Sequence, residues 1–518
     1  MRIGIDVGGT NTDAVLMDGH SVLGSVKTPT TANVTDGITD ALGTLLRDSE
    51  LAVDSVDGVM IGTTHFTNAV VERRHLTRTA CIRLGLPATA CLPPMVDWPK
   101  DLSEAVGGMM FMAHGGHEFD GREISPFDAG EVRDIAAQIR DEGIDVVAIS
   151  SVFSPVNARF EEDTAAIVRD AIPDAIITLS SSIGRIGLLE RENAAIMNGC
   201  LRQLAHQTIN GFRSALQEME ITAPFYISQN DGTLMAADFA AAYPVLTFAS
   251  GPTNSMRGAA FLSGLRDAIV VDVGGTTTDI GVLRHGFPRV AALAVEIGGV
   301  RTNFRMPDTI SIGLGGGSLI QGDPLQVGPR SVGYELTTRA QVFGGEELTA
   351  TDVVVAAGHE DIGDASRVSG LDSGLVAKVE DRIEDMVNIA VDRMKTSAAK
   401  VPVIVVGGGS ILVRRKVVGA SEMVRPDHFP VANAIGAAIA QVGGECDQIF
   451  SLAEMTRDEA LAKARAEATS RATAAGADPQ SVEIVEVEEV PLAYLPGNAT
   501  RIMVKAVGDL QEASDARH

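Results

Sequence analysis

The chain has 518 residues, enough for about three domains. Its formal net charge of −26 argues against nucleic acid or an anionic membrane surface as a partner, because both bind basic side chains. No run approaches the ~18 apolar residues of a membrane span and the first residues resemble a strand and a turn, so we expect a cytoplasmic protein with neither a membrane helix nor a leader peptide.

The first predicted element is a β-hairpin over residues 2–17. An apolar strand leads into DVGGTNTD, residues 6–13, and a second apolar run follows. The adjacent glycines let the backbone approach a ligand without a Cβ in the way. The carboxylate at the strand end suits a hydrated Mg²⁺. A single copy of this motif is also compatible with an ordinary tight turn.

Two stretches farther along the chain carry histidines. Residues 62–73 read GTTHFTNAVVER and include His65. Residues 113–121 read AHGGHEFDG, a glycine-rich loop in which His114, His117 and Asp120 lie three residues apart. Imidazole and carboxylate ligands suit a transition metal such as Zn²⁺ or Mn²⁺, so these three residues are a candidate metal site. The alternative is a polar loop whose side chains make ordinary hydrogen bonds.

Residues 186–202 have the apolar spacing of an amphipathic helix. Arg191, Glu192 and Asn193 lie at the polar edge of this helix, so we expect them to face solvent. The alternative interpretation is a helix that faces the substrate.

The motif of residues 6–13 recurs at residues 272–279 as DVGGTTTD. The two copies differ only at Asn11 and Thr277, and an apolar run lies on each side of both. A duplication with so long a period predicts two similar α/β lobes. Two such hairpins facing each other would clamp a triphosphate from both sides. Neither copy is a P-loop or a Rossmann motif, since no Gly-Lys-Ser/Thr follows and the chain turns back as a hairpin.

A further glycine cluster follows a buried-type strand over residues 403–406. A nucleoside could lie on the backbone at such a strand end. The next segment, residues 432–441, reads ANAIGAAIAQ and predicts a helix that packs closely on another helix. The cluster itself comprises Gly407, Gly408, Gly409 and Ser410.

The last part of the chain predicts a helix over residues 455–474 and two alternating strands over residues 481–495 and 499–508. An αββ unit of this size buries little on its own. We therefore expect it to pack on the second lobe or on a partner.

These segments, in this order, resemble the actin/hexokinase/Hsp70 ATPase superfamily. Residues 6–13 and 272–279 are similar to its two phosphate loops. Residues 406–410 are similar to its adenosine loop, and residues 432–441 to its second connecting helix.

Other segments resemble the hydantoinase/oxoprolinase family, and within it the α-type, N-methylhydantoinase A-like subunit. The family pattern Ser-Gly-Pro-Ala-Gly-Gly here reads SGPTNS at residues 250–255. This departure bears on the substrate and leaves the nucleotide fold unaffected. The similar segments are residues 62–73, 229–235, 250–252 and 310–331.

The resemblance implies an α/β, two-lobed actin-like ATPase fold with duplicated ribonuclease-H-like sheets. Residues 1–180 would form the N-terminal lobe, residues 181–445 the second lobe, and residues 446–518 a small C-terminal αββ element. ATP and Mg²⁺ would bind between the lobes. The implied catalytic residues are Asp6, Asp272, Asp13 and Asp279. The implied nucleotide-binding residues are Gly8, Gly9, Thr10, Asn11, Thr12, Gly274, Gly275, Thr276, Thr277, Thr278, Gly315, Gly316, Gly407, Gly408, Gly409 and Ser410.

The resemblance also implies an activity. Such a subunit uses ATP to activate a cyclic amide or ureide, of the hydantoin, 5-oxoproline or lactam type, by phosphoryl transfer before ring opening. A hydantoinase B-type partner subunit and an oligomer are implied. The alternatives are an ATP-dependent ketone carboxylase subunit, a sugar or acid kinase of the same fold, and an ATP-driven activator of a partner enzyme. Activators of this fold carry paired cysteines for an iron–sulfur cluster, whereas the four cysteines here are isolated.

Overall fold

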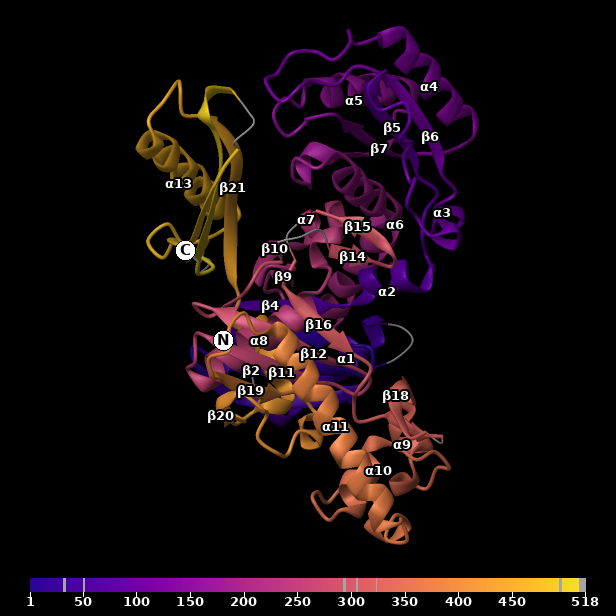
Figure 1. Ribbon diagram of the computed structural model, residues 1–518, viewed down its shortest axis with the longest axis vertical. Helices are drawn as coiled ribbons and strands as arrows, with labels where there is room; N and C mark the ends of the chain where they lie inside the picture. Colours follow the sequence, from indigo (N-terminus) through magenta and orange to yellow (C-terminus); the bar gives the residue numbers. More distant parts are fainter. Residues whose placement is uncertain are drawn as a thin grey trace.

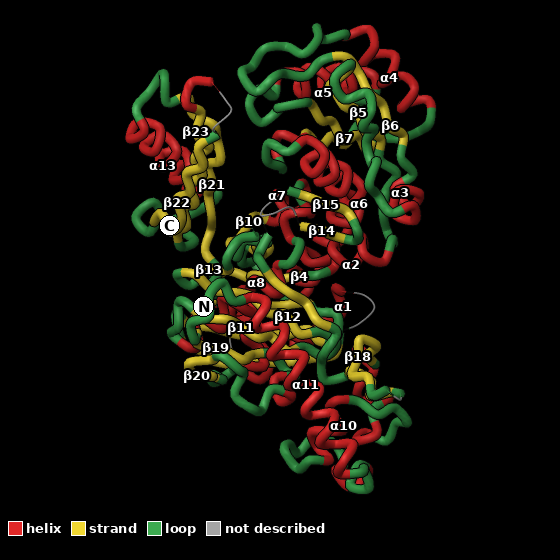
Figure 2. The backbone as a smooth tube through the Cα atoms, in the orientation of Figure 1, coloured by secondary structure: helices red, strands yellow, loops and turns green. Residues whose placement is uncertain are grey.

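The computed structural model describes residues 1–30, 34–49, 52–291, 295–303, 306–322, 324–492 and 496–511. Two sheet-based lobes form the centre of the molecule. Three smaller parts extend from them: a parallel-sheet insertion at the top of Figure 1, a C-terminal element beside it, and a mainly helical part at the bottom. The tube view shows strands gathered in the central body and in the C-terminal element (Figure 2).

The first lobe is built on a nine-stranded sheet in the order β22-β23-β21-β10-β9-β4-β1-β2-β3. Strand β1 runs parallel to β4, and β4 runs parallel to β9, so their carboxyl ends share one edge of the sheet. The strands are β1 (Arg2–Val7), β2 (Asn11–Asp18), β3 (Ser21–Pro29), β4 (Gly58–Thr63), β9 (Phe225–Ser228), β10 (Thr233–Ala236), β21 (Gln441–Ser451), β22 (Glu483–Pro491) and β23 (Ala499–Gly508).

Strand β1 is covered on both faces. Ile3 and Ile5 pack with α1 (Val34–Ser49) and the C-terminal half of α6 (Leu188–Glu218). Each fully buried isoleucine stabilises the fold by about 1.5–3 kcal/mol. On the other face, a Cβ on Gly4 would lie 2.1 Å from the Ala434 carbonyl oxygen. Helix α12 (Ala432–Ala438) therefore lies directly on the strand, where only glycine fits.

The second lobe has a six-stranded sheet in the order β13-β12-β11-β19-β20, with β16 beside β12. Helix α11 (Ser373–Met394) covers one face of the sheet and α8 (Ser250–Ser263) the other. The strands are β11 (Ala268–Val273), β12 (Thr278–Arg284), β13 (Phe287–Pro288), β16 (Thr309–Ile312), β19 (Val401–Val406) and β20 (Ala420–Val424). The part at the bottom of Figure 1 comprises β17 (Ser318–Gln321), β18 (Gln326–Ser331), α9 (Leu336–Arg339) and α10 (Ala350–Ala356).

The predicted duplication is confirmed strand by strand. Asp6 lies opposite Asp13 across β1 and β2, and Asp272 lies opposite Asp279 across β11 and β12. The third strand pairs in parallel in both lobes, as β4 with β1 and β19 with β11. The two-lobed actin-like α/β fold with duplicated sheets is therefore confirmed.

The region between β4 and β9 contains a separate, fully parallel sheet in the order β6-β5-β7-β8. The chain then returns through α6 and adds β9 and β10 to the first-lobe sheet. The predicted boundary between residues 180 and 181 thus does not separate the two lobes, because both sides of it contribute strands to the first. The insertion comprises β5 (Ala80–Leu86), α3 (Lys100–Val106), β6 (Met109–His114), α4 (Ala129–Asp141), β7 (Val146–Ser151), α5 (Arg159–Ala171) and β8 (Ile176–Leu179).

Helix α6 differs from its predicted amphipathic character. Arg191, Glu192 and Asn193 are buried at 0, 1 and 8% exposure, so the expectation of a solvent-facing edge is wrong. The insertion covers them: Arg83 pairs with Glu192, and Trp98 donates its indole N–H to Asn193 at 2.7 Å. Beside α6 lie α2 (His65–Glu72), α7 (Ala237–Ala242), β14 (Val295–Ile297) and β15 (Val300–Thr302).

The C-terminal element has the predicted αββ content, with α13 (Arg457–Ala474), β22 and β23. The described part of the predicted strand over residues 481–495 stops at residue 492, since residues 493–495 lie outside the described ranges. The element extends the first-lobe sheet through β10 and β21, so the expected packing on the second lobe or on a partner is not what the structure shows. Alanines spaced four residues apart let α13 pack closely on β21, since a Cβ on Gly444 would lie 2.2 Å from the Ala472 nitrogen.

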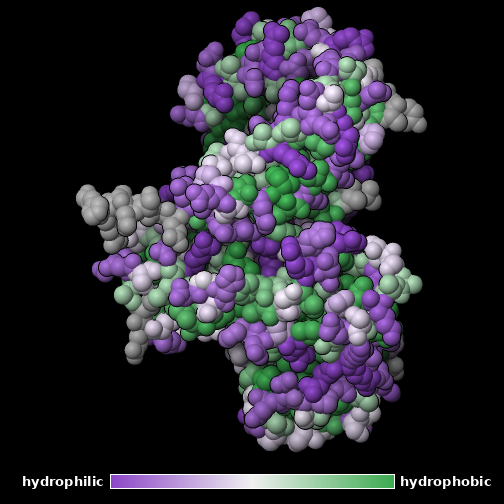
Figure 3. Space-filling model, turned by 90° about the vertical axis from the view of Figure 1, so that its left-hand side faces the viewer, coloured by the Kyte–Doolittle hydropathy of each residue, from purple (hydrophilic) through white to green (hydrophobic). Residues whose placement is uncertain are grey.

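The molecular surface is mixed in polarity. The face in Figure 3 carries hydrophilic residues at its top and bottom and more hydrophobic residues between them. Among the described helices, none combines the length and apolar character needed to cross a bilayer.

Candidate functional site

The two glycine hairpins meet between the lobes. A Cβ on Gly275 would lie 2.9 Å from the Thr10 side chain, so the second turn contacts the first. A Cβ on Gly9 would meet nothing within 4 Å, so the first turn keeps an open side. The accessible residues of the two turns are Gly8, Gly9, Thr10, Asn11, Gly274, Gly275, Thr276 and Thr277.

Both turns have the same internal hydrogen bond. The Gly8 N–H donates to the Asn11 carbonyl oxygen at 3.0 Å, and the Gly274 N–H donates to the Thr277 carbonyl oxygen at 2.9 Å. The equivalence of the two turns therefore extends from the sequence to the backbone.

The predicted glycines of the 310–328 segment lie behind the second turn. The Gly316 N–H donates to the Gly274 carbonyl oxygen at 3.1 Å, and a Cβ on Gly315 would lie 2.6 Å from the Gly275 carbonyl carbon. Thr278 is fully buried and donates its hydroxyl to the Leu314 carbonyl oxygen at 2.7 Å. Gly315, Gly316 and Thr278 thus support the turn, and Thr12 is also fully buried.

The predicted adenosine loop packs against the second hairpin. The Gly409 N–H donates to the Val273 carbonyl oxygen at 2.7 Å. A Cβ on Gly407, which has a φ of +85°, would lie 2.2 Å from an Asp272 carboxylate oxygen, so this position requires glycine. Gly408 is exposed, whereas Ser410 is buried and its hydroxyl has no hydrogen-bond partner in the described part of the chain.

The predicted catalytic carboxylates are buried close enough together for their negative charges to repel. Burial, and then the nearby Asp13 carboxylate, raise the pKa of Asp6 to about 6. Burial, and then Asp272, raise the pKa of Asp279 to about 6, while a hydrogen bond from Ser311 opposes this. Burial also raises the pKa of Asp272. Carboxylates that repel each other in a buried site favour a bound cation, which fits the Mg²⁺ implied by the fold.

Two residues that the sequence reasoning missed contact these carboxylates. Lys27 on β3 places its Nζ 2.5 Å from an Asp13 carboxylate oxygen. Asn433 on α12 donates to Asp6 and to Asp13, at 2.9 Å in both cases. The lysine had only a partial signal, because a regular hairpin that turns after residue 18 would place Val26 opposite Asp13, and the register shift between Leu16 and Met17 brings Lys27 there instead. Asn433 had none, since its partners lie more than 400 residues away.

Helices α8 and α12 cross closely enough to place such side chains. A Cβ on Gly258 would lie 1.9 Å from the Ala432 carbonyl oxygen, and one on Gly436 would lie 1.8 Å from the Asn254 carbonyl oxygen. Next to this crossing, hydrogen bonds from Asn254 to Asp6 and from Ser255 to Asp272 lower the pKa of each carboxyl and so oppose the effect of burial. Residues 250–255, which depart from the family pattern, thus supply one hydrogen bond to a carboxylate of each lobe.

In the predicted metal loop, the side chains of His114, His117 and Asp120 contact different neighbours. His114 lies 3.1 Å from the Glu131 carboxylate, and Asp120 lies 2.7 Å from the Arg122 guanidinium. His117 is buried, and its Nε2 lies 3.1 Å from the Asn157 side-chain nitrogen. In the described ranges no group of three or more His, Cys, Asp or Glu residues could hold a metal ion. The proposed set His114, His117 and Asp120 is therefore not assembled, because each side chain has a different neighbour.

This geometry defines a class: a two-lobed actin-like ATPase fold with paired glycine hairpins. The sequence comparisons then give the family. Residues 2–172 match the family model of the hydantoinase/oxoprolinase N-terminal region, and residues 191–445 match the hydantoinase/oxoprolinase model. The chain belongs to the hydantoinase/oxoprolinase family.

Several known proteins are similar to the chain. Caprolactamase subunit alpha of Pseudomonas jessenii is 26% identical over 469 residues, which cover 84% of this chain and 65% of that protein. 5-Oxoprolinase 1 of Arabidopsis thaliana is 24% identical over 405 residues, 69% of this chain and 31% of that protein. The acetophenone carboxylase gamma subunit of Aromatoleum aromaticum is 27% identical over 252 residues, 46% of this chain and 34% of that protein. The chain thus spans less than two thirds of the length of these relatives.

Two solved structures share the fold over 99% of this chain and 88% of their own. The ATP-dependent caprolactamase from Pseudomonas jessenii has a TM-score of 0.77 at 20% identity. The nucleotide-free acetone carboxylase has a TM-score of 0.74 at 16% identity.

Proposed function

We propose that this chain uses ATP to activate the carbonyl group of a cyclic amide before ring opening. The facing hairpins carry the proposal, because Thr10 and Gly275 meet between two strand ends that bear Asp6 and Asp272. The family relationship supports it, since relatives are named caprolactamase and 5-oxoprolinase.

The protein residues act by positioning and charge neutralisation, which dominate phosphoryl transfer. Asp6 and Asp272 would hold the hydrated Mg²⁺, which neutralises charge on the phosphates when bound. The accessible N–H groups and hydroxyls of the two turns, at Thr10 and Thr276, would bind phosphate oxygens. Lys27 would add a positive charge, because its ammonium group lies near Gly408 as well as Asp13.

In the proposed step, the carbonyl oxygen of the amide attacks the γ-phosphorus. The new P–O bond replaces the bond to the β-phosphate, and ADP leaves. Water then adds to the activated carbon and the C–N bond breaks, with the proton going to nitrogen, which leaves a ring-opened acyl phosphate. A second water adds to the acyl carbon, the C–O bond to phosphate breaks, and the carboxylic acid and phosphate are released. Each turnover therefore consumes one ATP and two waters.

A variant of one carboxylate tests this proposal. Asp272→Asn should retain the fold and reduce ATP turnover by ~10²-fold or more, the scale for losing a charge-stabilising group. Asp385→Asn, at an exposed position on α11, is the matched control. Steady-state ATP hydrolysis with lactam, hydantoin and 5-oxoproline measures the effect. Normal turnover by Asp272→Asn, or no thermal shift of the native protein with Mg-ATP, would contradict the proposal.

We further propose that ring opening needs a hydantoinase B-type partner subunit. Relatives are named as the alpha and gamma subunits of their enzymes. An activated phosphate intermediate is consumed by water, so a shared closed cavity would limit that loss. The chain alone should bind Mg-ATP and open little ring, and the partner should raise the amount of product per ATP consumed. Tightly coupled ring opening by the chain alone would overturn this proposal.

A further inference from the structure

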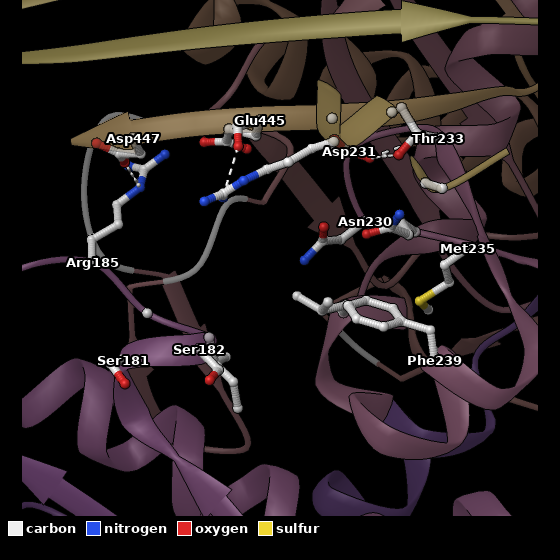
Figure 4. A pocket seen from close by; sticks show the side chains of 18 of the residues that line it. Ser181, Ser182, Arg185, Asn230, Asp231, Thr233, Met235, Phe239, Glu445 and Asp447 are labelled. Carbon is white, nitrogen blue, oxygen red and sulfur yellow. Dashed lines mark hydrogen bonds and ion pairs between the residues drawn. The ribbon is translucent and has the colours of Figure 1, made fainter. Parts of the chain in front are cut away.

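A cavity of about 950 Å³ lies where three parts of the molecule meet. The β9–β10 loop and α7 of the first lobe form one wall, and the loop that precedes α6 forms another. Strand β21, with Glu445 and Asp447, spans the top of the cavity in Figure 4. The C-terminal element, whose role the sequence did not reveal, thus supplies one wall. We refer to this space as the junction cavity.

Charged side chains that line the junction cavity form three ion pairs. Arg185 reaches Asp447 on β21 at 3.5 Å. Asp231 pairs with Lys505 at 2.8 Å. Arg471 pairs with Glu467, also at 2.8 Å. Because each of these charges already has a partner of opposite sign, the cavity favours a neutral ligand over an anionic one.

A hydrogen-bond donor on the wall lacks an acceptor. Asn230 lines the junction cavity and is 3% exposed. Within the described ranges its side-chain N–H₂ group has no hydrogen-bond partner. Leaving a buried donor unpaired is unfavourable, so a ligand that offers a carbonyl oxygen would satisfy it. Met235 and Phe239 lie near Asn230 and provide an apolar surface for ring methylenes (Figure 4).

One wall of the junction cavity lies at the same sheet edge as the first hairpin turn. The β9–β10 loop follows β9 at the sheet edge where the first glycine turn follows β1. Within the sheet, two strand spacings, about 10 Å, separate the β9–β10 loop from that turn. Thr253 on α8 donates its hydroxyl to the Asn230 carbonyl oxygen at 2.9 Å. The next two residues, Asn254 and Ser255, bond the carboxylates of the two lobes.

We propose that the junction cavity binds the ring of an uncharged cyclic amide, with its carbonyl oxygen on the Asn230 amide and its methylenes on Met235 and Phe239. This inference rests on the proposed function and narrows its substrate class. Lactams and hydantoins fit, whereas 5-oxoproline carries a carboxylate for which the cavity holds no uncommitted cation among the charges described above.

Calorimetric titration tests the assignment. The protein is first loaded with Mg²⁺ and a non-hydrolysable ATP analogue, and then titrated with ε-caprolactam, hydantoin and 5-oxoproline. At least one of the two neutral rings should bind at least ~10-fold more tightly than 5-oxoproline. Asn230→Asp, which keeps the size but removes the donor, should weaken that binding by about 10-fold, the scale of one hydrogen bond. Met235→Trp should also weaken it, because the larger side chain changes the apolar wall on which the ring methylenes would lie. Asn210→Ala on α6 is the control.

The nucleotide affinity separates this inference from the proposed function. All variants should bind the ATP analogue as the native protein does. If the native protein fails to bind the analogue, the proposed function fails and this inference falls with it. If the analogue binds but neither neutral ring does, or if both cavity variants bind the ring as tightly as the native protein, the cavity assignment alone is overturned.

Discussion

Replacing Asp6 by asparagine should stabilise the Mg²⁺-free protein while removing its ATP turnover. Asp6 is 4% exposed, and burial and Asp13 raise the pKa of Asp6 to about 6 from an ordinary 3.8. The folded state therefore binds the proton more tightly than the unfolded state. Protonation of Asp6 therefore stabilises the folded state. This stabilisation is fully present below pH ~4 and is lost as the pH rises through about 6.

The structure sets the size of the effect. A difference of about two pKa units corresponds to about 3 kcal/mol once the pH exceeds 6. A neutral amide of the same shape avoids this loss and can still accept the hydrogen bond from Asn433.

Thermal unfolding in EDTA between pH 4 and 8 measures this prediction. The Asp6→Asn variant should melt with the native protein near pH 4 and above it at pH 7, and Asp385→Asn should match the native protein throughout. Added Mg-ATP should stabilise the native protein only. A variant that melts below the native protein at pH 7, or by a margin independent of pH, would refute the electrostatic reasoning.

Two other changes test the clamp. Lys27→Met should lower ATP turnover by at least ~10-fold, because it removes a cation from the phosphate side of the site. Lys100→Met, on an exposed part of α3, should leave turnover unchanged. Equal turnover rates in the two variants would contradict a role for Lys27. Gly275→Ala should weaken Mg-ATP binding by at least ~10-fold in calorimetry, because the added Cβ would lie 2.9 Å from Thr10. Gly9→Ala should retain the native melting temperature, because a Cβ at Gly9 would meet no atom within 4 Å.

Local sequence predicted the hairpins well. Each hairpin is a contiguous segment whose strand pattern, glycines and terminal carboxylate define its structure, so the duplication was predictable. The glycine loop over residues 407–410 was predictable for the same reason, as Gly407 follows a strand that is buried at its end. Gly315 and Gly316 resembled ligand-binding glycines, but tight packing behind the second turn accounts for them.

Contacts between distant segments could not be predicted in the same way. Asn433 and Ser255 reach the carboxylates only because α8 and α12 cross at Gly258 and Gly436. The burial of Arg191 likewise depends on the insertion, whose sheet the sequence analysis did not separate from the first lobe. Residues His114 and His117 showed metal-like spacing, but side-chain direction in a loop is not set by spacing alone.

The transfer of the carbonyl oxygen to phosphate is the most direct test of the central claim. A lactam or hydantoin labelled with ¹⁸O at the reactive carbonyl is turned over with Mg-ATP and the partner subunit, and the released phosphate is analysed by mass spectrometry. If the γ-phosphoryl group is transferred to the carbonyl oxygen, one ¹⁸O atom appears in each phosphate released with product. Phosphate free of label, with all ¹⁸O retained in the ring-opened acid, would contradict the account.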